Sequence, residues 1–453
     1  MKHFILTIIS LITLLSNVAA QSDSLSRAQL KAEIKREILQ ELQEQEVQNQ
    51  DKNQWKSRLH LYGFIRNYIH YDTRECIAMT GELFNLVPKD VELNEKGEDI
   101  NDVSRMLFTS FTSRLGVDVT GPRLLNAQSS AKLEADFCGF SPTNTLFRIR
   151  HAYIQLDWKR LSLLLGQTWH PTFNVYPSCS SYSAGAPFSA SSRSPQLRLT
   201  WDAGHNWETM LSLLYQVPDM SVGPNGKTYD YARWNIWPEV YASIAHHGKH
   251  FTFGAGVTIL SLKPRKSSTA EQVNIGSDGT TTISQIQVPA HDRVLGISPE
   301  IFADYKYGLF NIKGKVTYAE NTSHLTMISG FGATDYNPQT GSYKYAPLRS
   351  VVSWLNLTYG KKFMGGIFLG YLDNLGAKKD FISTNDFWVY AAKNIDYVYR
   401  IAPSITFFAK NLEVGLEGDY TVAGYGDEAI DGNTKALRDV GNLRVSLMVR
   451  YRF

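Results

Sequence analysis

The chain has 453 residues, of which 43% are hydrophobic, 12% aromatic and 20% charged, a composition too apolar and aromatic for a disordered protein. The 46 Lys and Arg residues against 43 Asp and Glu leave a net charge of +3, which gives no basic field of the kind that binds nucleic acid. The mean hydropathy of −0.24, with no apolar run of about 20 residues after the N-terminus, excludes a multi-span helical membrane protein. A transmembrane β-barrel stays open, because only alternate residues of its strands meet lipid.

Residues 1–20 have the features of a secretory signal peptide. Lys2 and His3 precede an apolar stretch from Phe4 to Leu15, and Val18-Ala19-Ala20 supplies the small residues that a signal peptidase reads. We expect cleavage after Ala20 and export from the cytoplasm. The alternative is an uncleaved membrane anchor, but the apolar stretch is shorter than the about 20 residues that a span needs.

Residues 21–56 are expected to form a periplasmic helical segment. The stretch from Leu25 to about Gln50 is rich in Glu, Gln, Lys and Arg and contains no Gly or Pro. Its apolar residues recur every four positions, at Leu30, Ile34, Ile38 and Leu42. This spacing predicts an amphipathic helix, but it is not a clean heptad, so a short oligomeric coiled coil and a lone helix both fit.

From residue 57 to residue 453 apolar and polar side chains alternate, as expected for β-strands. In the first strand Leu61, Ile65 and Ile69 lie on one face, and Arg66 and His70 lie on the other. We predict about sixteen strands of this kind. They are Leu59–Tyr71, Leu107–Val119, Ala131–Phe137, Leu146–Trp158, Leu161–Trp169, Leu197–Trp201, Trp207–Val217, Val240–Ile244, Phe251–Ile259, Leu295–Tyr305, Phe310–Tyr318, Val351–Tyr359, Phe363–Tyr371, Tyr397–Phe407, Leu412–Val422 and Leu443–Phe453.

The connections between these strands alternate between very short ones, such as Lys410-Asn411, and mostly long ones, such as Ser261–Asp292. This alternation is typical of outer-membrane barrels, which have short periplasmic turns and long external loops. Aromatic residues expected to form an interfacial girdle end several strands: Tyr71, Trp169, Trp201, Tyr305, Tyr318 and Tyr359. A soluble β-sandwich shows the same period of two, but a single up-and-down rhythm over about 400 residues favours an all-β transmembrane antiparallel barrel.

Several motifs resemble the DcaP-like trimeric outer-membrane porins. These are RLGVDVTGP (114–122), KLEADFCG (132–139), RIRHAYIQL (148–156) and LLLGQTWHPTF (163–173), followed by GLEGDY (415–420) and the terminal YRF. The resemblance implies a 16-stranded barrel, a homotrimer, an N-terminal coiled coil and passage of small solutes, with dicarboxylates favoured by several members. Cys138 within the ADF motif and the long loops depart from the family pattern, so a substrate preference does not carry over.

Three cysteines, at positions 76, 138 and 179, have no metal-binding or redox spacing, and the sequence does not choose a disulfide pair among them. The segment His170–Ser194 follows the fifth strand, where trimeric porins fold a loop into the lumen. Its many Ser, Ala and Gly residues suit close packing against an inner wall, although a mobile external loop is the alternative.

Charged residues on the inward face are the candidates for selectivity, since an ion in a pore exchanges hydration for the charges around it. The selectivity candidates are Arg66, Arg114, Lys132, Arg198, Arg400, Arg444, Arg450, Glu413 and Glu417. Further inward acids are Asp118, Glu134, Asp136, Glu300, Asp304 and Asp419. We expect Arg66, Arg114 and Arg444 to form one cationic patch, because the first and last strands meet when the barrel closes.

Arg148 and Arg150 fall on the parity of apolar residues, which would point them at lipid. Either a β-bulge reverses the parity, or the two residues lie at the external rim or at a subunit interface. We favour the interface, because the first strands line the trimer contact in porins.

No nucleophile elbow, zinc-protease helix or phosphate-binding loop is present, so we predict neither an enzyme nor a cofactor. The leading hypothesis is an outer-membrane porin for passive diffusion of small hydrophilic, anionic (dicarboxylate-like) solutes. Its expected partners are outer-membrane lipid, such solutes and two further copies of the chain. The alternative is a structural or adhesive barrel that tethers the envelope.

Overall fold

The computed structural model describes residues 33–41, 58–140, 145–183 and 185–453. Residues 33–41 are helical, as predicted for this part of the N-terminal segment. The expected signal peptide and the rest of residues 21–56 lie outside the described residues. In the described part, no helix is long and apolar enough to cross a membrane.

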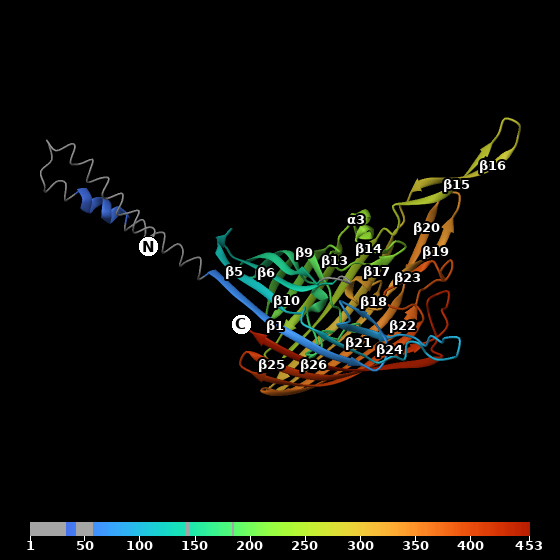
Figure 1. Ribbon diagram of the computed structural model, residues 1–453. Helices are drawn as coiled ribbons and strands as arrows, with labels where there is room; N and C mark the ends of the chain where they lie inside the picture. Colours follow the sequence, from blue (N-terminus) through green and yellow to red (C-terminus); the bar gives the residue numbers. More distant parts are fainter. Residues whose placement is uncertain (1–32, 42–57, 141–144, 184) are drawn as a thin grey trace, which may run out of the picture. The chain divides into compact units, whose positions relative to one another are not determined.

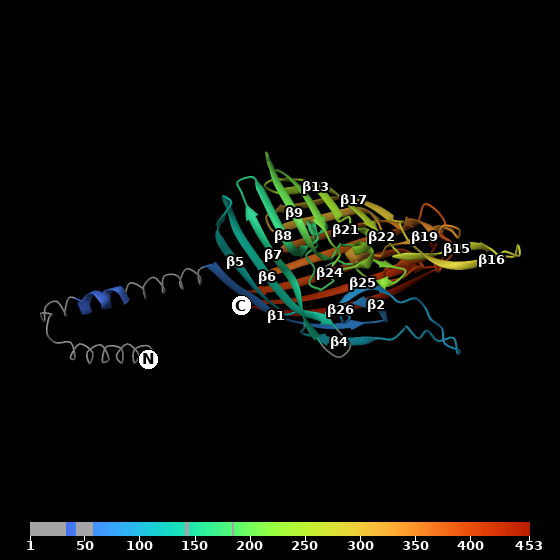
Figure 2. The same ribbon diagram turned by 90° about the horizontal axis from the view of Figure 1, so that it is seen from above.

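Within the described residues, strands at sixteen wall positions close into an antiparallel barrel (Figures 1 and 2). β4 and β5 together make one of these positions, and both pair with β1. β1 also pairs with β26, which closes the ring. The wall strands are β1 (Leu59–Asp72), β4 (Arg105–Thr109), β5 (Arg114–Leu124), β6 (Ala127–Phe140), β7 (Thr145–Asp157), β8 (Leu161–Trp169), β9 (Arg193–Gly204), β10 (Trp207–Leu214), β13 (Glu239–His247), β14 (Phe251–Leu262), β17 (Val294–Tyr307), β18 (Phe310–Glu320), β21 (Arg349–Gly360), β22 (Phe363–Gly376), β24 (Ile395–Ala409), β25 (Leu412–Tyr425) and β26 (Arg438–Arg452). The predicted fold class is therefore confirmed.

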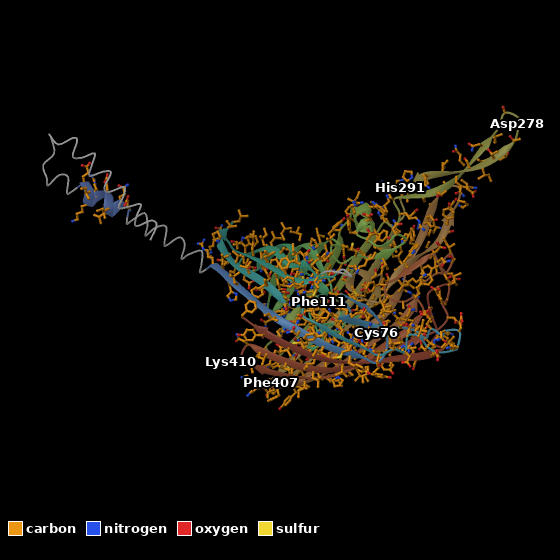
Figure 3. All side chains as sticks on the ribbon, viewed as in Figure 1. Cys76, Phe111, Asp278, His291, Phe407 and Lys410 are labelled. Carbon is orange, nitrogen blue, oxygen red and sulfur yellow. The ribbon has the colours of Figure 1, made fainter. Side chains whose placement is uncertain are left out.

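Short turns join the strands at one end of the barrel. Asn126, His205, Asn206 and Lys410 in these turns adopt positive φ, as tight hairpin turns require. Long connections lie at the opposite end, and Figure 3 shows Lys410 at the turn end and Asp278 at the tip of a projecting hairpin. The predicted alternation of short and long connections is thus present in the barrel.

The long connections carry secondary structure of their own. Hairpin β15 (Ser267–Ile275) and β16 (Thr281–Pro289) projects from the loop end (Figure 1). By contrast, the hairpin of β2 (Cys76–Met79) and β3 (Phe84–Pro88) is buried, with Leu86 and Val87 at most 1% exposed. The remaining elements are η1 (Pro171–Phe173), β11 (Val222–Gly223), β12 (Gly226–Lys227), α3 (Asp230–Asn235), η2 (Ser323–Leu325), β19 (Gly330–Asn337), β20 (Ser342–Pro347) and β23 (Phe387–Val389).

The two faces of the wall differ in polarity. On β17, Leu295, Ile297 and Ile301 are exposed on the outside, whereas Ser298 and Glu300 are buried inside. Since the outer surface consists of exposed aliphatic and aromatic side chains, it suits contact with lipid. Tyr, Trp and Phe lie exposed near its edges, as the girdle prediction requires: Tyr71, Trp201, Tyr305, Tyr359, Phe363 and Tyr451.

A β-bulge between β6 and β7 reverses the side-chain parity of one strand. Ala135 pairs with Ile149 and Glu134 pairs with His151, so Arg150 is an extra residue on β7. Its side chain is 1% exposed and forms ion pairs with Glu134 and Asp136 inside the barrel. Arg148 also bonds Asp136. The expectation that these two arginines lie at a subunit interface is therefore wrong, and the bulge accounts for them.

Residue 166 of β8 must be a glycine because the backbone of β7 lies very close to it. It has φ +133°, and a Cβ atom there would lie 2.2 Å from the Ala152 carbonyl oxygen. We expect Gly166→Ala to lower the free energy of unfolding by about 1–3 kcal/mol, because the strained backbone and the clash add. Gly365→Ala is the matched control, since its Cβ meets nothing within 4 Å. Denaturant unfolding from micelles, followed by tryptophan fluorescence, compares the two; equal midpoints would contradict the prediction.

Candidate pore constriction

The connection between β8 and β9, residues 170–183 and 185–192, crosses the lumen and is called the inner loop below. The Ser178 amide donates to Asn356 Oδ1 on β21 at 2.8 Å. The Ser180 amide donates to Glu417 Oε2 on β25 at 2.7 Å, and Tyr68 on β1 donates to the Ser180 carbonyl at 3.2 Å. The predicted inward loop is confirmed, and the alternative of a mobile external loop is wrong. Its small residues are buried against the wall as expected, at Ser180, Ser181, Ser183, Ala186, Ser189 and Ala190.

Charged strand residues bond the backbone of the inner loop. Lys315 Nζ on β18 donates to the Thr172 carbonyl and, at 2.7 Å, to Asn174 Oδ1, while Glu300 balances its charge at 3.3 Å. Arg400 Nη1 on β24 donates to the Ala186 carbonyl at 2.7 Å, and Asp419 lies 3.0 Å from its Nε. Because these backbone groups are buried, each needs such a partner.

Two of the predicted selectivity residues, Arg400 and Arg444, donate hydrogen bonds to backbone carbonyls of the first loop, residues 73–104, which contains the hairpin of β2 and β3. Arg400 Nη2 donates to the Asn85 carbonyl at 2.6 Å. Arg444 Nη1 donates to the Glu82 carbonyl at 3.0 Å, while Asp72 takes two hydrogen bonds of 2.8 Å from its other nitrogens. Both arginines are at most 2% exposed, so they anchor loops and present no free charge to the lumen.

The predicted patch of Arg66, Arg114 and Arg444 is wrong in its third member. The register places Arg444 opposite Asp72, whereas Arg450 lies opposite Arg66. The guanidinium carbons of Arg66, Arg114 and Arg450 lie 5.0, 5.1 and 5.4 Å from the centroid of the Phe64 ring. Glu413 forms ion pairs with Arg450 and Arg452, so the charge of Arg450 is compensated.

Five arginines gather around Tyr182 of the inner loop, and they are called the arginine cluster: Arg66, Arg114, Arg148, Arg150 and Arg193. The Arg66 guanidinium carbon lies 5.1 Å from the Tyr182 ring centroid, and Arg148 donates to its hydroxyl at 3.3 Å. The other three interact electrostatically with the same tyrosine. The cluster thus joins strands β1, β5, β7 and β9 to the inner loop.

Only two carboxylates form ion pairs with the cluster in the described part of the chain. Glu134 pairs with Arg114 at 3.5 Å and Arg150 at 2.7 Å, and Asp136 pairs with Arg148 at 3.0 Å and Arg150 at 2.9 Å. A third carboxylate, Asp219, accepts a hydrogen bond of 3.0 Å from the Arg193 backbone amide and interacts electrostatically with the Arg193 side chain. Five arginines against these three carboxylates still leave an excess of positive charge. Within the described residues, neither Arg66 nor Arg193 has a carboxylate oxygen within 4.0 Å of its guanidinium nitrogens, which makes these two the least compensated members.

Four nitrogen atoms of the cluster have no hydrogen-bond partner among the described residues. They are Arg66 Nη2, Arg114 Nε, Arg150 Nη2 and Arg193 Nε, and all four are buried. A buried donor without a partner costs about 1–3 kcal/mol, and more when it is charged. The positive charge of these groups is therefore only partly compensated by the protein, and its field favours anions on this side of the lumen.

An aromatic stack adjoins the cluster. The rings of Trp169 and Phe173 stack with centroids 4.2 Å apart, and Tyr176 stacks on Phe173 at 4.8 Å. Arg150 and Arg193 lie 5.4 and 4.9 Å from the Trp169 ring centroid. Trp169 is thus part of the constriction, and its assignment to the lipid-facing girdle is wrong.

Open space lies on the turn side of the constriction. One cavity of about 300 Å³ is lined by Arg198, Gln155 and Glu208, among others. A second, of about 570 Å³, is lined by Ser178 of the inner loop and by Lys306, Lys313 and Lys361. Arg198 therefore faces a cavity, as predicted, but Lys132 is paired with Asp118 at 2.7 Å and with the Tyr62 hydroxyl at 2.9 Å.

The sequence predictions missed Arg193, Tyr182 and the two arginines of the bulge. Arg193 and Tyr182 lie in or next to the inner loop, where the period-two alternation does not apply. The three cysteines, all in the described part of the chain, are free, so no disulfide bond restrains the loops.

No model of a known protein family matches the sequence, and no curated protein matches it either. Among solved structures, the outer-membrane channel DcaP of Acinetobacter baumannii is similar, with a TM-score of 0.61 and 19% identity over 87% of this chain and 97% of that chain. OmpT of Vibrio cholerae (15% identity, 87% and 97% covered) and an anion-selective porin from Comamonas acidovorans (9% identity, 87% and 99% covered) align with TM-scores of 0.49, too low to support an argument.

The similarity to DcaP confirms the predicted resemblance at the level of the fold. The chain has the fold of an outer-membrane channel, and its exposed apolar exterior agrees with that location. Its predicted place in the outer membrane is thereby confirmed.

Glu417 is expected to hold the inner loop in place. Glu417→Ala leaves the Ser180 and Ser181 amides without an acceptor, which costs about 1–3 kcal/mol and lets the loop leave its inner position more often. Burial raises the pKa of the Cys179 thiol in the same loop, so this thiol reacts slowly while the loop is in place. Cys76 and Cys138 are replaced by alanine so that only Cys179 reacts with a maleimide. In this background we expect Glu417→Ala to accelerate the labelling of Cys179 about tenfold. Glu271→Ala on the external hairpin is the control; an unchanged rate in Glu417→Ala would contradict the assignment.

Proposed function

We propose that the protein is an outer-membrane porin that admits small hydrophilic anions, with dicarboxylates as the favoured class, and that it acts as a homotrimer. The observation that carries the proposal is the arginine cluster, which surrounds Tyr182 of the inner loop and has more arginines than neighbouring carboxylates. The similarity in fold between this protein and an outer-membrane channel supports the part of the proposal that concerns passive diffusion through a pore.

The electrostatics of the constriction favour anions. A solute that passes within about 8 Å of the cluster, the screening length at physiological salt, feels its charge. Low-dielectric walls strengthen the interaction, because field lines concentrate in the lumen. The same excess charge repels cations. The cluster therefore raises the permeation rate of anions and lowers that of cations.

Two arginines on separate wall strands favour a solute with two carboxylates. Arg66 on β1 and Arg193 on β9 both interact with Tyr182, and neither has a carboxylate oxygen within 4.0 Å of its guanidinium nitrogens in the described part of the chain. A solute carboxylate near each arginine would compensate its charge. The neighbouring Trp169 and Phe173 rings offer an apolar surface for the part of the solute between its charges.

Planar-bilayer recording of the purified protein tests the pore. We expect discrete conductance steps, reduced when a millimolar dicarboxylate such as succinate is added, because a bound anion blocks the flow of chloride. A barrel that inserts and stays silent would contradict the proposal and favour the alternative of an envelope tether.

Neutralising Arg66 and Arg193, together with Arg114, whose ion pair with Glu134 is the longest in the cluster, is expected to weaken anion preference. The triple variant Arg66→Gln, Arg114→Gln, Arg193→Gln leaves Glu134 bound to Arg150 and leaves Asp136 bound to Arg148 and Arg150, so no carboxylate is stranded. We expect the ratio of chloride to potassium permeability to fall several-fold at 0.1 M salt and the effect to vanish near 1 M, where the Debye length is only about 3 Å. Arg160→Gln, on an exposed turn, is the control. An unchanged ratio at low salt would exclude the cluster as the selectivity element.

The proposed trimer draws support from the sequence resemblance and from the helical residues 33–41. Deleting residues 25–50 should leave the conductance of each channel unchanged, because the pore wall begins after this segment, while native gel electrophoresis should show fewer trimers. A collapse of single-channel conductance would refute the separation of the helix from the pore.

A further inference from the structure

Two histidines and a glutamate from three distant parts of the chain meet at one buried point. His170 opens the inner loop, Glu239 begins β13, and His324 lies in η2 between β18 and β21. Glu239 Oε1 lies 3.1 Å from His170 Nε2 and 2.9 Å from His324 Nε2. One ligand atom from each residue falls within 4.8 Å of the others, and each of the three side chains is about 1% exposed.

The protein leaves this group incompletely satisfied. Glu239 Oε2 and His324 Nδ1 are buried, and neither has a hydrogen-bond partner among the residues that the structure describes. In the described part of the chain, no lysine or arginine forms an ion pair with Glu239, and the nearby Lys315 is paired with Glu300. A buried carboxylate with one bare oxygen and no fixed positive charge is costly, so the arrangement calls for a cation.

We propose that His170, Glu239 and His324 bind a divalent transition-metal ion of the zinc class inside the barrel. Two imidazoles and one carboxylate are donors that zinc prefers, and hard ions such as calcium prefer an all-oxygen set. Both imidazoles ligate through Nε2 and Glu239 through its carboxylate, whose bare Oε2 also allows bidentate binding.

Thr172 contacts the second ring nitrogen of His170. His170 Nδ1 lies 2.8 Å from Thr172 Oγ1 and accepts a hydrogen bond of 3.3 Å from the Thr172 amide, which indicates the tautomer with the ring proton on Nε2, facing Glu239. A metal ion bound at Nε2 would move this proton to Nδ1, which would then donate it to the Thr172 hydroxyl. A hydrogen bond of this kind orients a metal-bound histidine and fixes its tautomer.

The ion would tie both ends of the inner loop to η2. His170 starts the loop, and at its other end the Ser191 amide donates to the Leu325 carbonyl at 2.9 Å. Thr326 Oγ1 also donates to the Ser191 carbonyl, at 2.6 Å. The metal therefore adds a cross-link that stabilises the inner loop in the lumen, independently of which solute the pore admits.

Zinc binding to the full-length chain in detergent micelles, without a polyhistidine tag, tests the site. After treatment with a chelator and desalting, the protein is titrated with Zn²⁺ against a competing indicator. We expect one zinc ion per chain and a higher unfolding temperature with zinc. His324→Ala and Glu239→Gln should each weaken binding at least about tenfold, and His291→Ala on an exposed loop should bind as the wild type does.

Two results would overturn the proposal: a wild-type chain that binds no zinc at micromolar concentration, or variants that bind with unchanged affinity. Heat-dependent gel mobility establishes that each variant is a folded barrel. X-ray absorption of the zinc-loaded wild type gives a second measure that needs no variant. It should show two imidazoles with oxygen donors, and sulfur ligands from the cysteines would contradict the assignment.

Discussion

The structure depends on the requirement that every polar group placed inside the barrel must find a partner there. The inner loop brings backbone amides and carbonyls into a space walled by β-strands, where unpaired groups are costly. Lys315, Arg400 and Glu417 meet this requirement from three different strands. Because each of these residues bonds the loop backbone, the position of the loop is fixed from the wall, while small side chains let it pack closely and its aromatic residue Tyr182 contacts the arginine cluster. The charged residues of β18, β24 and β25 thus determine where the pore narrows.

The same requirement separates two kinds of lumenal arginine. Arg400 and Arg444 are each matched to one aspartate and to loop carbonyls, so their charges are used in holding structure. The arginine cluster has more guanidinium groups than carboxylates, and four of its buried nitrogen atoms have no hydrogen-bond partner among the described residues. An excess of buried positive charge is unfavourable for folding alone. Its presence beside the inner loop is understandable if an anion completes it.

The wall of the barrel could be predicted from the sequence, whereas much of the site could not. All sixteen predicted strands correspond to wall positions, since a period of two and the alternation of turns and loops are local signals. Parity fails where the local period is broken, and the extra residue in β7 therefore turned Arg150 from outside to inside. The sequence predicts that the first and last strands are neighbours, but it does not predict which of their residues face each other. The grouping of Arg444 with Arg66 is wrong for this reason. The meeting of His170, Glu239 and His324 depends on two long connections and the start of β13, and it has no sequence signature.

We propose that the excess positive charge beside the inner loop makes the pore prefer anions. The zero-current potential of the wild-type protein, in a bilayer between two KCl concentrations at or below about 0.1 M, measures this preference where screening is weak. We expect a potential displaced toward the chloride equilibrium value. A potential displaced toward the potassium equilibrium value would show that the pore prefers cations.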